Sequence, residues 1–244
     1  RSSAASAQGN YYAEPPYGVA ASTVGPYKDN TFEASPLARI VEMANPRDDV
    51  WSTTARKSST YTKMNVAGEV PYWKDFISGI PQRLDYHPAN TLLVKETTDE
   101  EGKVTKQYTN FRNKVVMTRV GKDLEWFDTH FIYSPSGLLM KVLQPEGVAR
   151  LSSEFDGVSD ENKRIFMDRW MFQYQYDAEQ REKARRVPGY AEDSIGWHYT
   201  VYDKWNRIVL TQDPHQRTRN EYSFLKYDRF NRSIMTGVYI TGSS

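Results

Sequence analysis

The stretch YDKWNRIVLTQDPHQRTRNEYSFLKYDRFNRSIMTG, residues 202–237, contains the same six-residue phrase twice. Tyr-Asp-x-x-Asn-Arg begins at Tyr202 and is repeated from Tyr227, about 25 residues further on. Asp and Asn tolerate tight turns because their side chains bond the nearby backbone. Two strands of ordinary length and two turns fill about 25 residues. Each phrase therefore predicts the corner of a β-hairpin.

The residues around the first phrase have the pattern of paired strands. In GWHYTVYD, residues 196–203, Trp197, Tyr199 and Val201 fall on the opposite face from the side chains between them, which is the period of a strand. A return strand is expected over residues 207–211. A second turn is expected at residues 212–214, because proline cannot donate a hydrogen bond to a ladder.

The same hairpin pattern is predicted at other places along the chain. Aligning the tyrosines that open each copy gives Tyr108, Tyr133, Tyr176, Tyr202 and Tyr227. The residues predicted to form the structural repeat motif are Tyr133, Gly137, Tyr176, Asp177, Arg181, Tyr202, Asp203, Asn206, Arg207, Tyr227, Asp228, Asn231 and Arg232.

One short helix is expected between two of these hairpins, over about residues 159–170. Ser159 is suited to be its N-cap, and Phe166 and Trp170 share a face four residues apart. The predicted fold class is all-β, with repeated antiparallel hairpins of about 25 residues and this single inserted helix. Residues 1–30 are expected to be an extended or poorly ordered leader, and residues 31–244 the sheet.

Composition limits the classes of function. The 244 residues carry 32 basic and 31 acidic side chains, so no strong field attracts nucleic acid or an anionic membrane. No apolar run reaches the roughly 18 residues of a membrane span. Cysteine is absent, which excludes disulfides and thiolate chemistry. The chain opens Arg-Ser-Ser and ends Gly-Ser-Ser, and we interpret it as a piece of a longer protein.

The sequence predicts no catalytic, cofactor-binding or metal-binding residue. Its four histidines, His87, His130, His198 and His215, show no ligand spacing. Carboxylates are plentiful, yet a catalytic acid–base pair requires two of them at a defined distance in the folded chain, and a sequence does not show that distance. The basic run QREKARRV, residues 180–187, is expected to be a solvated turn, because acidic residues surround it.

The repeated phrase resembles the YD repeat of bacterial Rhs proteins, which is also found in teneurins and in the cocoon components of Tc toxins. Three further blocks within residues 26–242 are similar to a subgroup of large, secreted Rhs-repeat proteins: YKDNTFEASPLARIVEMANPRDDVW, ANTLLVKETTDEEGKVTKQY and FIYSPSGLLMKVLQPEGV. The chain departs from the family pattern at Ser134, which replaces Asp, and at Asn206 and Asn231, which replace the usual glycine. Asn tolerates the left-handed backbone of such a turn.

The resemblance implies a β-sheet ribbon that spirals into a hollow shell, often around a toxic C-terminal domain. We expect a non-enzymatic structural segment of a secreted or cell-surface bacterial protein. It would contribute strands to a shell that encloses or presents a toxin or effector. Expected partners are the rest of the same polypeptide, and a strand-pairing partner or secretion machinery. No nucleic acid, membrane span or cofactor is expected.

Two other classes of function stay open at this stage. The many Tyr and Trp residues also suit a cell-surface adhesin or carbohydrate-binding repeat, since aromatic rings stack on sugars. A glycoside-active enzyme is the third class. The terminal run SIMTGVYITG, residues 233–242, is β-prone and uncharged, so it predicts an exposed sheet edge that a partner must cover. Residues 11–27 are one candidate cover.

Overall fold

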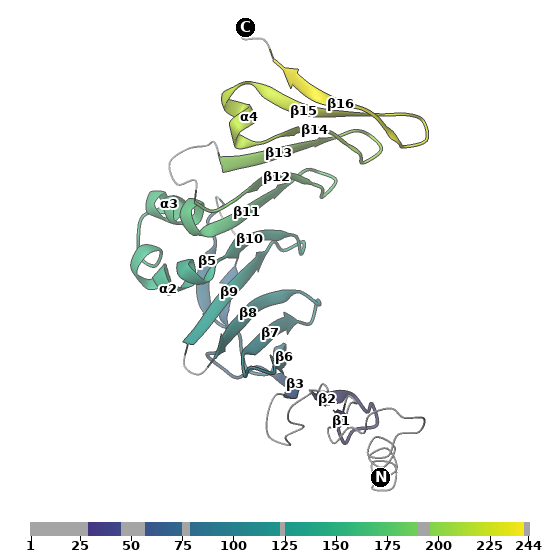
Figure 1. Ribbon diagram of the computed structural model, residues 1–244. Coiled ribbons are helices and arrows are strands. Elements are labelled where there is room, and N and C mark those ends of the chain that lie inside the picture. The colour runs from purple at the N-terminus through teal and green to yellow at the C-terminus, as the bar shows by residue number, and fades with distance from the viewer. Residues whose placement is uncertain (1–28, 45–56, 75–78, 123–124, 190–195, 242–244) are drawn as a thin grey trace, which may run out of the picture.

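The chain forms one long antiparallel sheet. The computed structural model describes residues 29–44, 57–74, 79–122, 125–189 and 196–241. Within them, 14 strands form a single sheet in the order β1-β2-β3-β6-β7-β8-β9-β10-β11-β12-β13-β14-β15-β16, and β4 and β5 form a separate pair. The strands stack in almost the order of the sequence, from the N-terminal end to the C-terminal end (Figure 1). The prediction of an all-β fold built from repeated hairpins is therefore confirmed.

The strands are short and are joined by local connections. Their bounds are β1 Asp29–Phe32, β2 Ile40–Ala44, β3 Lys57–Met64, β4 Pro71–Lys74, β5 Gln82–Tyr86, β6 Leu92–Thr98, β7 Val104–Asn110, β8 Val115–Lys122, β9 Glu125–Tyr133, β10 Leu139–Leu143, β11 Met171–Tyr176, β12 Glu182–Arg186, β13 Trp197–Tyr202, β14 Ile208–Gln212, β15 Glu221–Tyr227 and β16 Ser233–Ile240. The first described strand begins at residue 29, and most of the leader expected over residues 1–30 lies outside the described residues.

The described residues contain three helices, where the sequence predicted one: α2 Pro145–Glu154, α3 Asp160–Trp170 and α4 Pro214–Thr218. Helix α3 matches the prediction, and the Ser159 side chain accepts a hydrogen bond from the Asn162 amide. Helix α4 replaces the turn expected at residues 212–214. Asp213 caps it in a capping box, and Pro214 occupies its first turn, where no amide donor is needed.

The core lies over the middle of the sheet. Helices α2 and α3 and the β4–β5 pair pack there, and their buried side chains form one cluster with the ends of β10 and β11: Ile80, Leu143, Leu151, Phe155, Phe166, Met167 and Met171. A second cluster joins the start of β4 to strands β6 to β8: Val70, Leu92, Val94, Tyr108 and Met117. Burial of these apolar groups stabilises the middle of the sheet.

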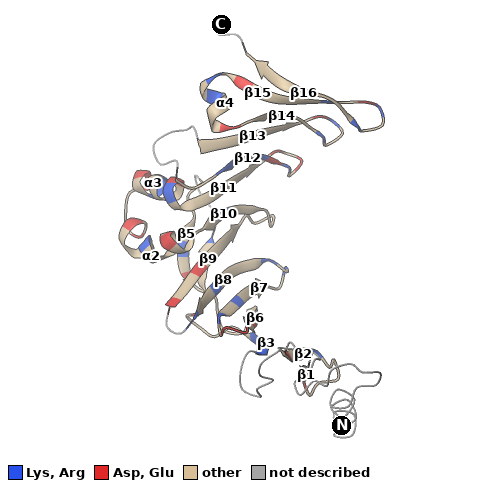
Figure 2. Cartoon of the chain, viewed as in Figure 1, with Lys and Arg blue, Asp and Glu red and all other residues tan. Residues whose placement is uncertain are grey.

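The two long borders of the sheet differ. From β7 onward one border carries a tight turn at every hairpin, and we call it the turn rim (residues 110–114, 134–138, 177–181, 203–207 and 228–232). The opposite border carries the helices (Figure 1). Basic and acidic residues are interspersed along the chain (Figure 2). The described residues include no helix long and apolar enough to cross a membrane.

Candidate functional site

Each hairpin of the turn rim closes through one repeated hydrogen-bond pattern. In the turn Asp203–Arg207, the Asn206 amide donates to the Asp203 carbonyl at 3.1 Å, and the Asp203 amide donates to the Arg207 carbonyl at 2.9 Å. Asp203 Oδ1 also accepts from the amides of Trp205 at 2.8 Å and Arg207 at 3.0 Å. The same pair of backbone bonds recurs in the other four turns. This is a three-residue loop closed by a left-handed residue.

The fourth position of each turn has a positive φ. The five residues there are Asn113 (57°), Gly137 (85°), Gln180 (63°), Asn206 (62°) and Asn231 (64°). The first position holds a short polar side chain: Asn110, Ser134, Asp177, Asp203 or Asp228. Asn and Gly enter the left-handed region most readily, so Gln180 is the residue least suited to its place.

Three turns add an ion pair between their first and last residues. The Arg–Asp distances are 2.6 Å for Arg181–Asp177, 2.7 Å for Arg207–Asp203 and 2.7 Å for Arg232–Asp228. Desolvation raises the pKa of the Asp203 carboxyl. Hydrogen bonds from the Arg207 backbone and side chain outweigh that effect and hold the pKa below its usual range. These carboxylates are therefore ionised and are occupied with closing the turn.

A tyrosine joins each hairpin to the one before it. The Tyr133 hydroxyl donates to the Val115 carbonyl at 2.9 Å, where Val115 is the first residue of the preceding return strand. Three more tyrosines repeat this contact with the first residue of β10, β12 and β14: Tyr176 to Leu139 at 2.8 Å, Tyr202 to Glu182 at 3.0 Å and Tyr227 to Ile208 at 2.9 Å. The four tyrosines of the predicted motif thus make one and the same contact.

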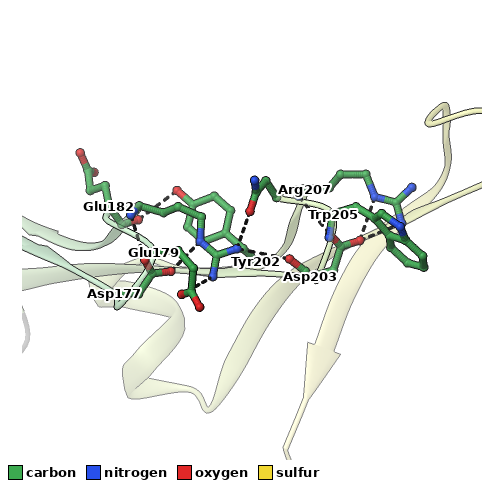
Figure 3. Close-up of polar contacts among 9 residues, drawn as sticks. Asp177, Glu179, Glu182, Tyr202, Asp203, Trp205 and Arg207 are labelled. Carbon is green, nitrogen blue, oxygen red and sulfur yellow. Dashed lines mark hydrogen bonds and ion pairs between the residues drawn. The ribbon is translucent and has the colours of Figure 1, made fainter.

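Arginine makes a second contact between neighbouring turns. Arg181 Nη1 donates to the Asp203 carbonyl at 3.4 Å and to Asn206 Oδ1 at 2.8 Å (Figure 3). Arg207 Nη1 donates to the Asp228 carbonyl at 3.4 Å. The guanidinium of Arg181 also lies 4.9 Å from the centre of the Tyr202 ring, a distance at which cation–π attraction acts.

The pair Arg207 and Tyr227 repeats this stacking at 4.6 Å. Together, the tyrosine bond, the arginine bond and the stacked ring form what we call the hairpin ladder. Each step of this ladder needs groups from two successive hairpins. A hairpin therefore completes the polar contacts of the one that precedes it.

Tyr108 does not belong to the hairpin ladder, although the sequence alignment placed it there. The turn after β7 starts at Asn110, so Thr109 occupies the place that Tyr133 has in the next hairpin. Tyr108 is buried in the core and its hydroxyl donates to Glu69. Burial raises the pKa of the Tyr108 hydroxyl. A shift of one residue moves a side chain to the other face of a strand.

The basic run over residues 180–187 is a strand and not a solvated turn. Only Gln180 and Arg181 belong to a turn, and residues 182–186 form β12 inside the sheet. Ala184 and Arg186 are buried, and Arg186 forms an ion pair of 3.1 Å with Asp168 of α3. The charge of Arg186 is thus neutralised by a helix that packs on the sheet.

The four histidines lie apart in the fold. His130 is buried in β9, where its Nδ1 accepts a hydrogen bond from Trp73 Nε1 at 3.1 Å. His87 follows β5, His198 is in β13 and His215 is in α4. Among the described residues, no group of three or more His, Asp or Glu side chains has metal-site geometry.

A cavity of about 490 Å³ lies between the last two turns. Its walls are Trp205, Arg207, Tyr227, Asp228, Arg229 and Asn231. Trp205 is 64% exposed, and the same holds for Phe230 in the following turn. The turn rim therefore ends in a pocket with both aromatic and cationic walls, which the sequence analysis did not single out.

Comparisons with known proteins find matches of low similarity among solved structures. No protein-family model matches the sequence, and no curated protein matches it. A Tc holotoxin pore of Photorhabdus luminescens matches with 11% identity and a TM-score of 0.47, over 89% of this chain and 9% of that chain. A TcdB2–TccC3 crystal structure matches with 11% identity and a TM-score of 0.44, over 88% of this chain and 10% of that one.

The chain thus spans about a tenth of the length of the two solved chains. Likeness at this level assigns neither a family nor an activity to it. The hairpin ladder and the cavity at its end are the features of this chain on which a function can be argued.

Proposed function

We propose that this chain is a non-enzymatic structural segment that supplies successive hairpins to the wall of a larger β-sheet. The observation that carries this proposal is the tyrosine-to-carbonyl bond, which recurs at four junctions between hairpins. A catalytic or binding site needs a particular group at one place. A wall needs the same contact at every repeat, because each repeat touches only its neighbours.

The finer part of the proposal concerns what the wall surrounds. The phrase repeated at Tyr202 and Tyr227 and the three sequence blocks resemble secreted Rhs-repeat proteins. On that resemblance, the wall belongs to a shell that encloses or presents a toxin or effector of the same polypeptide. The sheet suits this role, because its 14 strands run without interruption through the described residues and a twisted sheet of that length curves.

Electron cryo-microscopy of the full polypeptide that carries this sequence tests the proposal. The expected result is that the strands of residues 29–241 form part of one continuous, curved sheet. Density for another domain is expected on the concave side of that sheet. A flat or isolated sheet with both faces in solvent would contradict the shell. Turnover of a glycoside that is abolished by one carboxylate substitution would contradict the non-enzymatic assignment.

A second function, carbohydrate binding, is favoured by the cavity at the end of the turn rim. Exposed Trp205 and the charged side chain of Arg229 have the chemistry of a sugar-stacking site with a polar partner. A glycan array probed with the chain and with the Trp205→Ala variant tests it. Binding that depends on Trp205 would support an adhesin, and the absence of binding to any glycan would remove this alternative.

A further inference from the structure

The C-terminal border of the sheet ends the hairpin ladder with one half of a step. Strand β16 pairs with β15, and no other strand of the described residues pairs with it. Arg232 and the Ser233 carbonyl occupy the positions that Arg207 and the Ile208 carbonyl hold one hairpin earlier. We propose that this border, Arg232 together with β16, is a docking surface for another β-hairpin whose outgoing strand ends in Tyr-Asp.

The preceding steps of the ladder specify the contacts of that hairpin. Arg207 stacks on Tyr227 and donates to the Asp228 carbonyl, while the Ile208 carbonyl accepts from the Tyr227 hydroxyl. Applied one step further, the pattern requires a tyrosine that stacks on Arg232 and donates to the Ser233 carbonyl. It also requires a turn whose first carbonyl accepts from Arg232. An aromatic residue without a hydroxyl satisfies only part of this set.

The exposure of the three arginines shows that the last step lacks its second half. The side chains of Arg181 and Arg207 are 23% and 18% exposed, whereas that of Arg232 is 73% exposed. All three make the same ion pair within their own turn. The difference therefore comes from the following hairpin, which covers the first two guanidinium groups. Apart from its ion pair with Asp228, Arg232 has the ring of Phe230 from its own turn beside it, at 5.4 Å.

The surface of β16 is suited to strand pairing. All eight of its residues are exposed, and none is charged. Ile234 and Ile240 are each 64% exposed, and Val238 is 58% exposed. Edge strands that stay free usually carry Lys, Pro or a short length to prevent pairing. An uncharged strand of eight residues, beside an arginine whose ion pair and ring contact lie within its own turn, has instead the features of an interface.

The occupant is a Tyr-Asp hairpin and not a second copy of the described sheet. At the N-terminal end of the sheet the edge strand is β1. It also runs toward a turn closed by an acidic residue and an arginine, Glu33 and Arg39. The aromatic residue before Glu33 is Phe32, which has no hydroxyl. A copy docked through β1 would therefore leave the Ser233 carbonyl without its donor. This inference rests on the proposed function, because it names the partner that extends the wall.

A peptide copy of this chain's own repeat serves as the probe. Residues 219–232 contain the outgoing strand and the turn but lack the β16 sequence, so the peptide cannot continue the sheet itself. We expect the full chain to bind it, with slower hydrogen exchange of the β16 amides. A Tyr227→Phe peptide should bind about fivefold more weakly, since it lacks one neutral hydrogen bond.

Substitutions in the chain give the matched controls. Arg232→Gln should weaken peptide binding about tenfold, because it removes both the stacking on the peptide's tyrosine and the bond to the peptide's turn carbonyl. Arg229→Gln, which removes the same charge from the same turn, should change binding less than about twofold. Val238→Lys should abolish binding by placing a charge on the edge. The side chains of Arg232 and Val238 are largely exposed, so these variants remain folded.

Three results would overturn the inference. The first is no binding of the peptide, and the second is equal weakening by Arg229→Gln and Arg232→Gln. The third is self-association of the chain through β16 that the peptide does not compete with. None of these results would contradict the proposed role of the chain in a shell. A shell seen by cryo-microscopy together with a peptide that does not bind would leave the proposed function intact and reject this docking surface.

Discussion

Acidification should destabilise this protein through His130, a buried residue outside the hairpin ladder. His130 is 2% exposed, and its Nδ1 accepts a hydrogen bond from the Trp73 indole. The pKa of His130 is lowered to about 4, chiefly by desolvation; the charge of Asp128 opposes this shift, and the charges of Arg119 and Arg83 add to it. The imidazole is therefore neutral in the folded protein at pH values where it is charged in an unfolded chain.

The sign and size of the effect follow from this difference. The unfolded chain has the ordinary histidine pKa of 6.5, and the folded chain has a pKa of about 4. Above the higher value both states are neutral and His130 contributes no pH dependence. As the pH falls between the two values, only the unfolded state gains the proton. The free energy of unfolding then decreases by about 1.4 kcal/mol per pH unit, or roughly 3 kcal/mol in all.

Urea unfolding followed by tryptophan fluorescence measures this loss for the natural chain and for His130→Gln. The Gln side-chain oxygen can still accept from Trp73, but it does not titrate. Between about pH 7 and about pH 4.5, which covers most of this interval, the natural chain should lose about 2.5 kcal/mol more than the variant. Carboxylates contribute equally to both proteins and cancel in the difference. If the free energies of unfolding of the two proteins fell by the same amount over this pH range, the reasoning would be refuted.

Three further predictions concern stability in thermal or urea unfolding. Gln180→Gly should stabilise the chain by about 1 kcal/mol, because Gln180 has a φ of 63° that glycine adopts without strain; an unchanged midpoint would contradict the turn geometry. Asp168→Asn should cost about 3 kcal/mol by leaving the Arg186 charge buried, while Arg186→Met should cost far less; equal losses would show that the ion pair is unimportant. Gly147→Ala should cost about 1–3 kcal/mol, since its Cβ would lie 2.6 Å from Leu143; natural stability would show that the helix can move.

The hairpins could be predicted because their rules are local. Asp203 and Asn206 carry the turn in a short phrase, and Ser159 carries the start of α3 in the same way. Helix α4 was missed because Pro214 was interpreted as a break, although proline also suits a first helical turn once Asp213 caps it. Helix α2 has no side-chain cap at Gln144, so its start carries only a weak signal.

The errors in the site have a tertiary origin. Residues 182–186 form a strand by pairing with β11 and β13, and the buried charge of Arg186 is paired with Asp168, which comes from a helix elsewhere in the chain. The misplacement of Tyr108 arose because tyrosines were aligned by identity, whereas the turn is defined by Asn110. The contacts between hairpins through Arg181 and Arg207 need the spacing of neighbouring turns, and a single sequence does not contain that spacing.

The contrast between the two borders of the sheet has a consequence for how such a chain can change in length. On the turn rim every loop from β7 onward has the same size, and a residue added there would displace the tyrosine and arginine contacts of two hairpins at once. The opposite border already accommodates α2 and α3 between Leu143 and Met171. New segments, epitope tags or whole domains should therefore be accepted on the helical border and rejected on the turn rim.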